Sequence, residues 1–190
     1  MTLKRLVLWC SLFLTYPVAG LLGRAAGGPV DSLVAAVLAG AVAGAVIGAG
    51  QWFVLRPFGL DARWIAATAV GLGAGLGLGQ VAFGYGTEMS DVALIGVASG
   101  LGVGCAQWAL LRARTNSILW IPAITAFWTV AWVVTTAVGI DPADRWAIFG
   151  VSGALTFAVL SGATLWVLGV SETARTTRSA TPPKPRLATS

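Results

Sequence analysis

Histidine is absent from this sequence of 190 residues, and only 10% of the residues are charged. The absence of histidine removes the commonest general base and the commonest metal ligand. A soluble domain has about a quarter of its residues charged, so this chain has too few charges to cover a water-soluble globule. Because 57% of the residues are hydrophobic, we expect lipid to be the solvent for much of the exterior.

Cysteine is also scarce, and the two that occur, Cys10 and Cys105, lie within apolar runs. Their spacing is not that of a metal site, so we interpret them as buried small hydrophobic residues. Without histidine, and without paired carboxylates inside the apolar runs, general acid–base catalysis lacks its usual groups. We therefore expect no catalytic residue, no metal and no cofactor, and a protein that is not an enzyme.

Long charge-free runs, in contrast, are frequent. A helix needs about 20 apolar residues to cross the hydrocarbon core. Six runs have about this length, and they are continuously apolar, unlike the alternating strands of a membrane β-barrel. They are Leu6–Gly23, Ser32–Leu55, Trp64–Thr87, Val92–Leu111, Thr115–Ile140 and Trp146–Ser171. We predict an all-α, polytopic membrane protein with six transmembrane helices.

The basic residues favour one orientation of these helices. With the N-terminus in the cytoplasm, the outside connections hold only Arg24 and Arg145. All other basic residues then lie inside: Lys4, Arg5, Arg56, Arg63, Arg112, Arg114, Arg175, Arg178, Lys184 and Arg186. This is the positive-inside bias of short loops, which predicts that both termini are cytoplasmic.

The first run has an alternative interpretation. Lys4-Arg5, the apolar stretch that follows and the small residues Ala25-Ala26 also suit a secretory signal peptide. An internal repeat, in which the first run has later counterparts, favours a membrane helix instead.

That repeat has an offset of 56 residues. The matching residues are Gly40, Gly44, Gly48, Gln51, Trp52, Leu55, Arg56 and Trp64-Ile65, which recur as Gly96, Gly100, Gly104, Gln107, Trp108, Leu111, Arg112 and Trp120-Ile121. One match could be chance, but this many at a single offset indicate duplication.

A third copy is degenerate. It keeps the small-residue ladder and the tryptophan as Ala154, Ala158, Gly162 and Trp166. Leu165 replaces the glutamine and Val170 the arginine, while Trp9 stands 55 residues before Trp64. We therefore predict three parallel helical hairpins, with repeats at about 1–56, 57–112 and 113–170, in a pseudo-threefold bundle.

The run Gly48-x-x-Gln51-Trp52-x-x-Leu55-Arg56 and its copy, which begins at Gly104, resemble a group of uncharacterised bacterial multi-pass membrane proteins with repeated Gly-x-x-Gln-Trp-x-x-Leu-Arg hairpins. The similarity covers most of the membrane region. It implies a protein of the bacterial inner membrane, but no activity and no cofactor. The third hairpin departs from the motif, so any role shared by the two glutamines is not threefold.

Small residues at every fourth position let two helix backbones approach closely, which favours association in lipid. The second and fourth helices carry such ladders, Gly40-Gly44-Gly48 and Gly96-Gly100-Gly104. We expect them to meet the sixth helix at the centre of the bundle. The third helix adds alternating glycines from Gly71 to Gly79, which predict close packing or local flexibility. Their spacing is not that of a nucleotide-binding loop.

Gln51 and Gln107 are the first polar candidates. At about 100° per residue they share the glycine-bearing face rather than facing lipid. Each can form an interhelical hydrogen bond or contact a ligand, and the sequence leaves both open. Gln80, near the outer end of the third helix, is a further candidate.

Tryptophans and arginines gather near the predicted cytoplasmic boundary. They are Trp9, Trp52, Trp64, Trp108, Trp120 and Trp166, with Arg56 and Arg112. We interpret them as an aromatic belt with basic anchors at the membrane interface. The alternative is a vestibule that recognises an anionic headgroup or partner.

After a membrane domain of residues 1–170, residues 171–190 are polar, basic and rich in Pro and Thr, which predicts a disordered cytoplasmic tail. We expect the bilayer, and a membrane protein or a second copy of this chain, as partners, and no nucleic acid. Two functions remain: a non-enzymatic module that packs against a partner or organises lipid, and a small transporter or solute-binding subunit for a neutral or apolar solute. A sealed core favours the first, and an open polar cavity lined by the glutamines the second.

Overall fold

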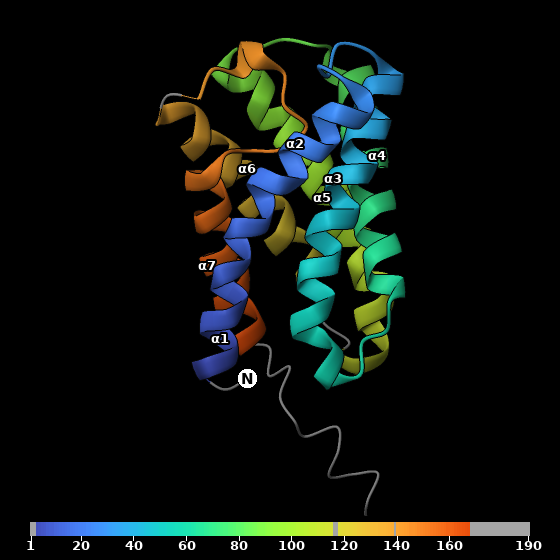
Figure 1. The fold of residues 1–190 in the computed structure, drawn as a ribbon, viewed down its shortest axis with the longest axis vertical. Helices are drawn as coiled ribbons and strands as arrows, with labels where there is room; N and C mark the ends of the chain where they lie inside the picture. The colour runs from blue at the N-terminus through green and yellow to red at the C-terminus, as the bar shows by residue number, and fades with distance from the viewer. Residues whose placement is uncertain (1–2, 116–117, 139, 168–190) are drawn as a thin grey trace, which may run out of the picture.

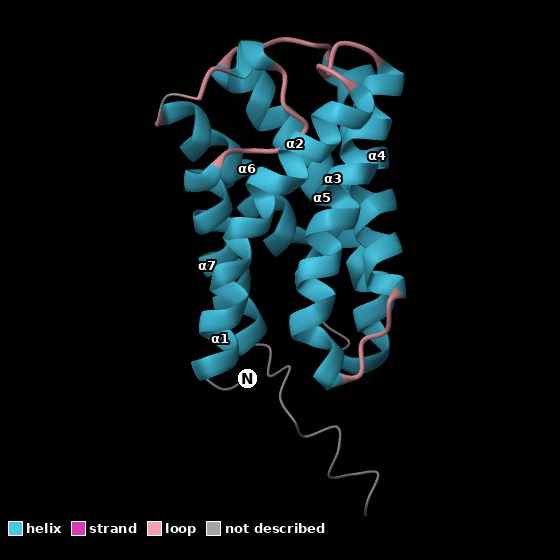
Figure 2. Cartoon of the chain, in the orientation of Figure 1, coloured by secondary structure: helices cyan, strands magenta, loops and turns pink. Residues whose placement is uncertain are grey.

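The computed structural model describes residues 3–115, 118–138 and 140–167, and these residues form helices and no strand (Figure 2). In chain order the elements are α1 (Leu3–Cys10), the 3-10 turn η1 (Ser11–Leu14), α2 (Thr15–Gly27), α3 (Leu33–Leu55), η2 (Arg56–Phe58), α4 (Arg63–Phe83), α5 (Met89–Thr115), α6 (Trp120–Ala137), η3 (Pro142–Asp144) and α7 (Val151–Val167) (Figure 1).

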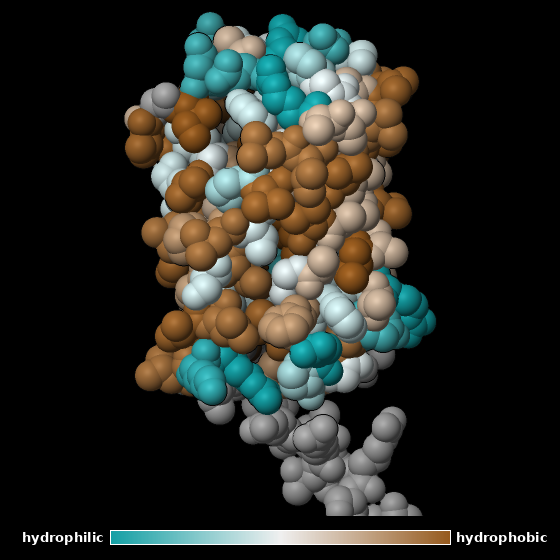
Figure 3. All heavy atoms as spheres, in the orientation of Figure 1, coloured by the Kyte–Doolittle hydropathy of each residue, from teal (hydrophilic) through white to brown (hydrophobic). Residues whose placement is uncertain are grey.

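Five helical segments are long and apolar enough to cross a membrane. They are Leu3–Gly27, Leu33–Phe58, Arg63–Phe83, Met89–Arg112 and Trp120–Ala137. Large hydrophobic side chains cover the middle of the visible face, and hydrophilic residues lie at its two ends (Figure 3). Leu21, Val70 and Leu78 are each more than 60% exposed, which suits a lipid surface and not water. The protein is therefore a multi-pass integral membrane protein, and the prediction is confirmed at this level.

The last helix differs from its prediction. It begins at Val151 rather than Trp146 and has 17 described residues. The chain just before it is not helical: it bends at Ala147 and Ile148, and Ile148 and Phe149 are buried inside the bundle. Hydropathy alone does not separate these conformations, because both are apolar.

The helices pack in chain order, each against its neighbours, and α1 closes the ring against α7. The first membrane segment runs obliquely: α1 and η1 lie beside α7, and α2 lies against α3 (Figure 1). The 3-10 turn η1 precedes Pro17, whose missing N–H and bulky ring disturb the preceding helical turn. Gly28, with φ of 76°, ends α2 in a conformation that glycine adopts at low cost.

The two ends of the bundle differ in charge. The N-terminus and the α3–α4 and α5–α6 connections meet at one end (Figure 1), here called the basic end after Lys4, Arg5, Arg56, Arg63 and Arg112. The α2–α3, α4–α5 and α6–α7 connections meet at the other, called the acidic end after Asp31, Glu88, Asp91, Asp141 and Asp144. The fold thus separates the charges as the sequence pattern indicates.

The glycines of α4 are divided between two neighbours. A Cβ at Gly73 would lie 3.0 Å from the carbonyl oxygen of Val37 in α3. A Cβ at Gly75 would lie 2.7 Å from the carbonyl oxygen of Ala98 in α5. Because backbone blocks both faces, α4 is closely packed, which is one of the two outcomes that its glycines predict.

The small-residue ladders of α3, α5 and α7 do not meet at the bundle centre, and that expectation is wrong. A Cβ at Gly40 would lie 3.0 Å from the Cα of Gly73 in α4, and one at Gly100 would lie 2.8 Å from the Cα of Thr125 in α6. A Cβ at Gly162 of α7 would instead meet side-chain atoms, with Cδ1 of Trp9 in α1 at 2.8 Å. Each ladder therefore joins one helix to the next around the ring.

Large side chains fill the interior that the ring encloses. Phe149 lies among aromatic rings from three helices, with centroids 5.2 Å from Tyr16, 4.9 Å from Trp128 and 6.1 Å from Phe157. These residues belong to one hydrophobic cluster to which every membrane segment contributes. The aromatic edges and faces add to the burial of apolar area.

Candidate functional site

A chain of hydrogen bonds runs between the two glutamines and two tryptophans in the basic half of the bundle. The indole N–H of Trp64 donates to Oε1 of Gln51 at 3.0 Å, and that of Trp120 donates to Oε1 of Gln107 at 3.3 Å. Nε2 of Gln107 donates to Oε1 of Gln51 at 2.9 Å and to the hydroxyl of Thr68 at 3.0 Å. All five side chains are at most 3% exposed.

The donors and acceptors of this network are mutually consistent. An indole N–H only donates, so each glutamine must turn its carbonyl oxygen toward its tryptophan. Gln107 then has an amide N–H to offer to the oxygen of Gln51. The Thr68 hydroxyl accepts from Gln107 and donates to the carbonyl of Trp64 at 2.9 Å. Buried polar groups that are paired in this way avoid the free-energy cost of a buried donor or acceptor that has no partner.

The glycine ladders position both glutamines. A Cβ at Gly48 would lie 2.9 Å from Cβ of Thr68 and 3.0 Å from Cα of Ile65. The missing side chain lets α3 and α4 approach closely one turn from Gln51, so the amide reaches the indole of Trp64. Gly104 stands against Ile121 in the copy of this contact. The motif spacing therefore couples close backbone packing to one buried polar contact.

A third indole bond joins the first and last membrane helices. Trp9 of α1 donates from Nε1 to the hydroxyl of Ser161 in α7 at 3.0 Å, and both residues are buried. Ser161 lies one turn before Leu165, the residue that occupies the glutamine position. The internal repeat does not identify Ser161, because this acceptor is a serine rather than a glutamine and lies one turn before the glutamine position. A tryptophan that matches Trp64 and Trp120 but lacks a glutamine partner was the available signal.

The burial of Trp64 and Trp120 corrects their assignment as interface anchors. Their side chains are 0% and 1% exposed and their N–H groups are bonded inside the protein. Trp52 and Trp108 are half-buried. Hydropathy and position place a tryptophan near the interface, but neighbouring helices decide whether it faces lipid.

Arg56 and Arg112 lie exposed at the basic end, as expected of anchors. The guanidinium of Arg56 lies 4.3 Å from the ring centroid of Phe53 and 5.8 Å from that of Trp52. Arg112 lies 5.7 Å from the centroid of Trp108. These contacts stack each cation on the preceding turn of its own helix and leave its charge at the bundle end.

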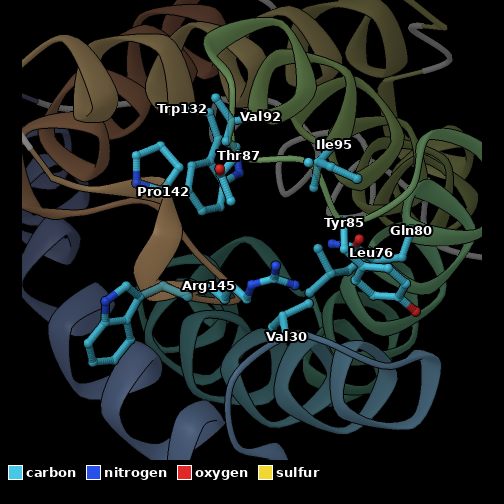
Figure 4. A pocket seen from close by; sticks show the side chains of 12 residues that line it. Val30, Leu76, Gln80, Tyr85, Thr87, Val92, Ile95, Trp132, Pro142 and Arg145 are labelled. Carbon is cyan, nitrogen blue, oxygen red and sulfur yellow. The ribbon is translucent and has the colours of Figure 1, made fainter.

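Gln80 belongs to a different place, a pocket at the acidic end. The side chain is 8% exposed, and its Oε1 has no hydrogen-bond partner among the described residues. The pocket also receives side chains from α5, α6 and the connection after η3, including Arg145 (Figure 4). The structure thus separates Gln80 from the other two glutamines, which do not line this pocket.

The cysteines are less buried than expected. Cys105 is exposed on the apolar surface, and Cys10 is partly buried. Both contact the region that lipid occupies, so their apolar character suits them there as well. Within the part of the chain that the structure describes, no three Cys, Asp or Glu residues gather as they would around a metal ion.

Comparisons with models of protein families, with curated proteins and with solved structures find no match for this chain.

Proposed function

We propose that this protein is a non-enzymatic module of the bacterial inner membrane that packs against another membrane protein or organises lipid around itself. The observation that carries this proposal is the paired state of Gln51 and Gln107. Their amides bond to each other and to buried indoles, so they hold the bundle together rather than line an open path. The charged residues of the described membrane segments lie near the segment ends. The middle of each segment therefore lacks the buried charge that proton relays and ion-coupled transporters use.

The proposal includes an origin by duplication. Three hairpins, related by a pseudo-threefold axis, would place Trp64, Trp120 and Trp9 at equivalent contacts. The support is that each indole donates to the helix that packs against its own, at Gln51, Gln107 and Ser161. The resemblance to bacterial proteins with the same hairpin motif fits this origin.

The proposed orientation puts the basic end in the cytoplasm. The support is that the basic residues gather at one end of the bundle, because short loops rich in Lys and Arg lie on the cytoplasmic side of membrane proteins. The basic tail of residues 171–190 lies outside the described residues, and its predicted disorder and cytoplasmic location stay predictions.

The proposal is tested by extracting the protein from its native membrane within polymer-bounded lipid discs. Quantitative mass spectrometry should find one membrane protein, or further copies of this chain, in a fixed ratio to it. In parallel, the purified protein in liposomes should move no solute across the bilayer. Solute movement that depends on the protein would contradict the proposal and favour a transporter.

A second candidate, a solute-binding membrane subunit, is favoured by one specific observation. The pocket at the acidic end is lined by Arg145 and by Gln80, whose buried amide oxygen has no partner in the residues that the structure describes. Such a site is compatible with a sealed basic half.

A further inference from the structure

We propose that the pocket at the acidic end binds a zwitterion, a small group that carries one anion and one ammonium. The anion would pair with Arg145 and the ammonium would donate to Gln80. This inference goes beyond the proposed function, because the pocket and the paired glutamines occupy opposite halves of the bundle.

The frame of the pocket is held from several directions. The carbonyl of Arg145 accepts a hydrogen bond from the backbone N–H of Val30 at 3.0 Å. The guanidinium of Arg24 donates to the carbonyl of Asp144 at 2.5 Å and lies 4.8 Å from the ring centroid of Trp146. The connection between α6 and α7 is thereby fixed to α2 and the α2–α3 connection, across the mouth of the bundle.

Arg145 has an unusual backbone conformation for its residue type. Its φ is 53° and its ψ is 50°, in the left-handed backbone region that residues other than Gly, Asn and Asp seldom adopt. The side chain extends into the middle of the lining residues, with Val30 and Leu76 beside it (Figure 4). Among the described residues Arg145 has no carboxylate partner. The ion pair that these residues form joins Arg63 to Asp61, at the basic end. A guanidinium held in this position is available to an anion.

Two buried polar atoms on the pocket residues have no hydrogen-bond partner within the described part of the chain. Oε1 of Gln80 needs a donor, and the indole N–H of Trp132 needs an acceptor. Their side chains are 8% and 6% exposed. Leaving such groups unpaired is costly, so the pocket favours a ligand that both donates and accepts hydrogen bonds.

The surrounding charge selects a zwitterion over a simple anion. The acidic end as a whole carries five carboxylates, none of which lines the pocket, against the two guanidinium groups of Arg24 and Arg145. The net negative charge of the acidic end opposes the approach of a lone anion and favours an ammonium. A ligand with both charges would pair its anion with Arg145, while its ammonium would be attracted by the acidic end.

The enclosed part of the pocket is small and has room for only a few heavy atoms, so the rest of such a ligand would lie in the open mouth. The cavity volume is about 40 Å³, and the space between the lining atoms, with its open mouth, is about 390 Å³. Apolar side chains, among them Leu76, Val92 and Ile95, form part of the wall. Two sources share this chemistry: a free amino acid and the phosphoethanolamine headgroup of a lipid in the adjacent leaflet.

The test uses the full-length protein in phosphatidylglycerol discs, titrated calorimetrically with glycine, acetate and methylammonium. A second arm uses discs that contain phosphatidylethanolamine and counts the retained lipid by native mass spectrometry. We expect saturable binding of one zwitterion per chain, from one or both sources. Acetate and methylammonium, each with half of the recognised charges, should bind at least about tenfold more weakly.

Arg145→Asn removes the guanidinium while asparagine tolerates the left-handed backbone, so the variant should fold. Zwitterion binding should weaken at least about tenfold in this variant and in Gln80→Leu, since each loses a hydrogen bond to a charged group. Arg63→Gln, an equal change of charge on an exposed residue at the basic end, should bind as the unmodified protein does. The inference is overturned if neither zwitterion binds, if acetate binds as well as glycine, or if Arg145→Asn binds normally.

Discussion

The side-chain amide of Gln107 links α5 to three other helices, through Gln51 in α3, Thr68 in α4 and Trp120 in α6. Lipid offers no replacement for any of these bonds, because hydrocarbon neither donates nor accepts. The residue therefore combines two roles: it satisfies the buried indole and it fixes the rotational setting of neighbouring helices.

Replacing Gln107 with leucine should lower the free energy of unfolding by about 1 to 2 kcal/mol, because it leaves the Trp120 N–H and the Thr68 hydroxyl with fewer partners. The matched control is Gln80→Leu, which removes an oxygen that has no partner among the described residues and should cost little. Reversible unfolding in mixed micelles measures both. Equal losses in the two variants would contradict the stabilising role of the network.

Ser161 is the acceptor that closes the ring. In Ser161→Ala the buried indole N–H of Trp9 is left unpaired, which should cost about 1 to 3 kcal/mol. In the described structure the Thr164 hydroxyl donates to the Leu160 carbonyl on its own helix, so Thr164→Ala should change the stability by less than about 0.5 kcal/mol. A double-mutant cycle of Ser161→Ala with Trp9→Phe isolates the pair, and a coupling energy near zero would show that this bond does not hold α1 to α7.

Among the helices, α4 is closely constrained, because neighbouring backbone limits two of its faces. Gly75→Ala would put a Cβ 2.7 Å from the Ala98 carbonyl oxygen and 2.8 Å from the Cα of Ser99. Backbone atoms cannot turn aside as side chains can, so we expect α4 and α5 to separate at a cost of about 1 to 3 kcal/mol.

Gly20→Ala is the control for this prediction. Its new methyl would meet only side-chain atoms, at 3.6 Å and beyond, in the helix α2. Alanine is the better helix former, so this variant should be neutral or more stable by up to about 1 kcal/mol. A thermal unfolding series in detergent ranks the two, and similar midpoints would show that the close approach of α4 to α5 is not required.

The sequence predicted the bounds of most helices well, but not those of α7 or the packing partners of the glycine ladders. Charge-free runs placed five membrane segments within a few residues, because crossing lipid requires a continuous apolar helix. The start of α7 was placed too early, since the apolar residues before Val151 are buried inside the bundle in a bent, non-helical conformation. The glycine ladders predicted close contact but not the partner, because periodicity defines a helix face and not what lies opposite.

The polar residues show the same limit. Gln51 and Gln107 could be placed on a packing face from their spacing to glycine, but their bond to each other depends on how three helices are rotated about their axes. Trp64 and Trp120 have the composition of an interface belt and are nonetheless buried. The pocket at the acidic end combines Gln80 with Arg145 from a distant loop, a proximity that no local pattern contains.

Across the entire bundle, the ring of helices separates a basic end from an acidic end, and every connection contributes to this division. The inner leaflet of a bacterial membrane would meet the arginines, and the pocket would open on the opposite side. The seal of paired glutamines and the proposed zwitterion pocket would then face different compartments. All of these assignments depend on the direction in which the bundle crosses the membrane.

That direction is measured by single cysteines in a background with Cys10→Ala and Cys105→Ala. Ala62→Cys lies exposed at the basic end and Ala143→Cys lies exposed at the acidic end. In intact cells, a membrane-impermeant maleimide should label Ala143→Cys at once and should label Ala62→Cys only after the membrane is permeabilised. Labelling of Ala62→Cys in intact cells, or of both sites from the same side, would contradict the account.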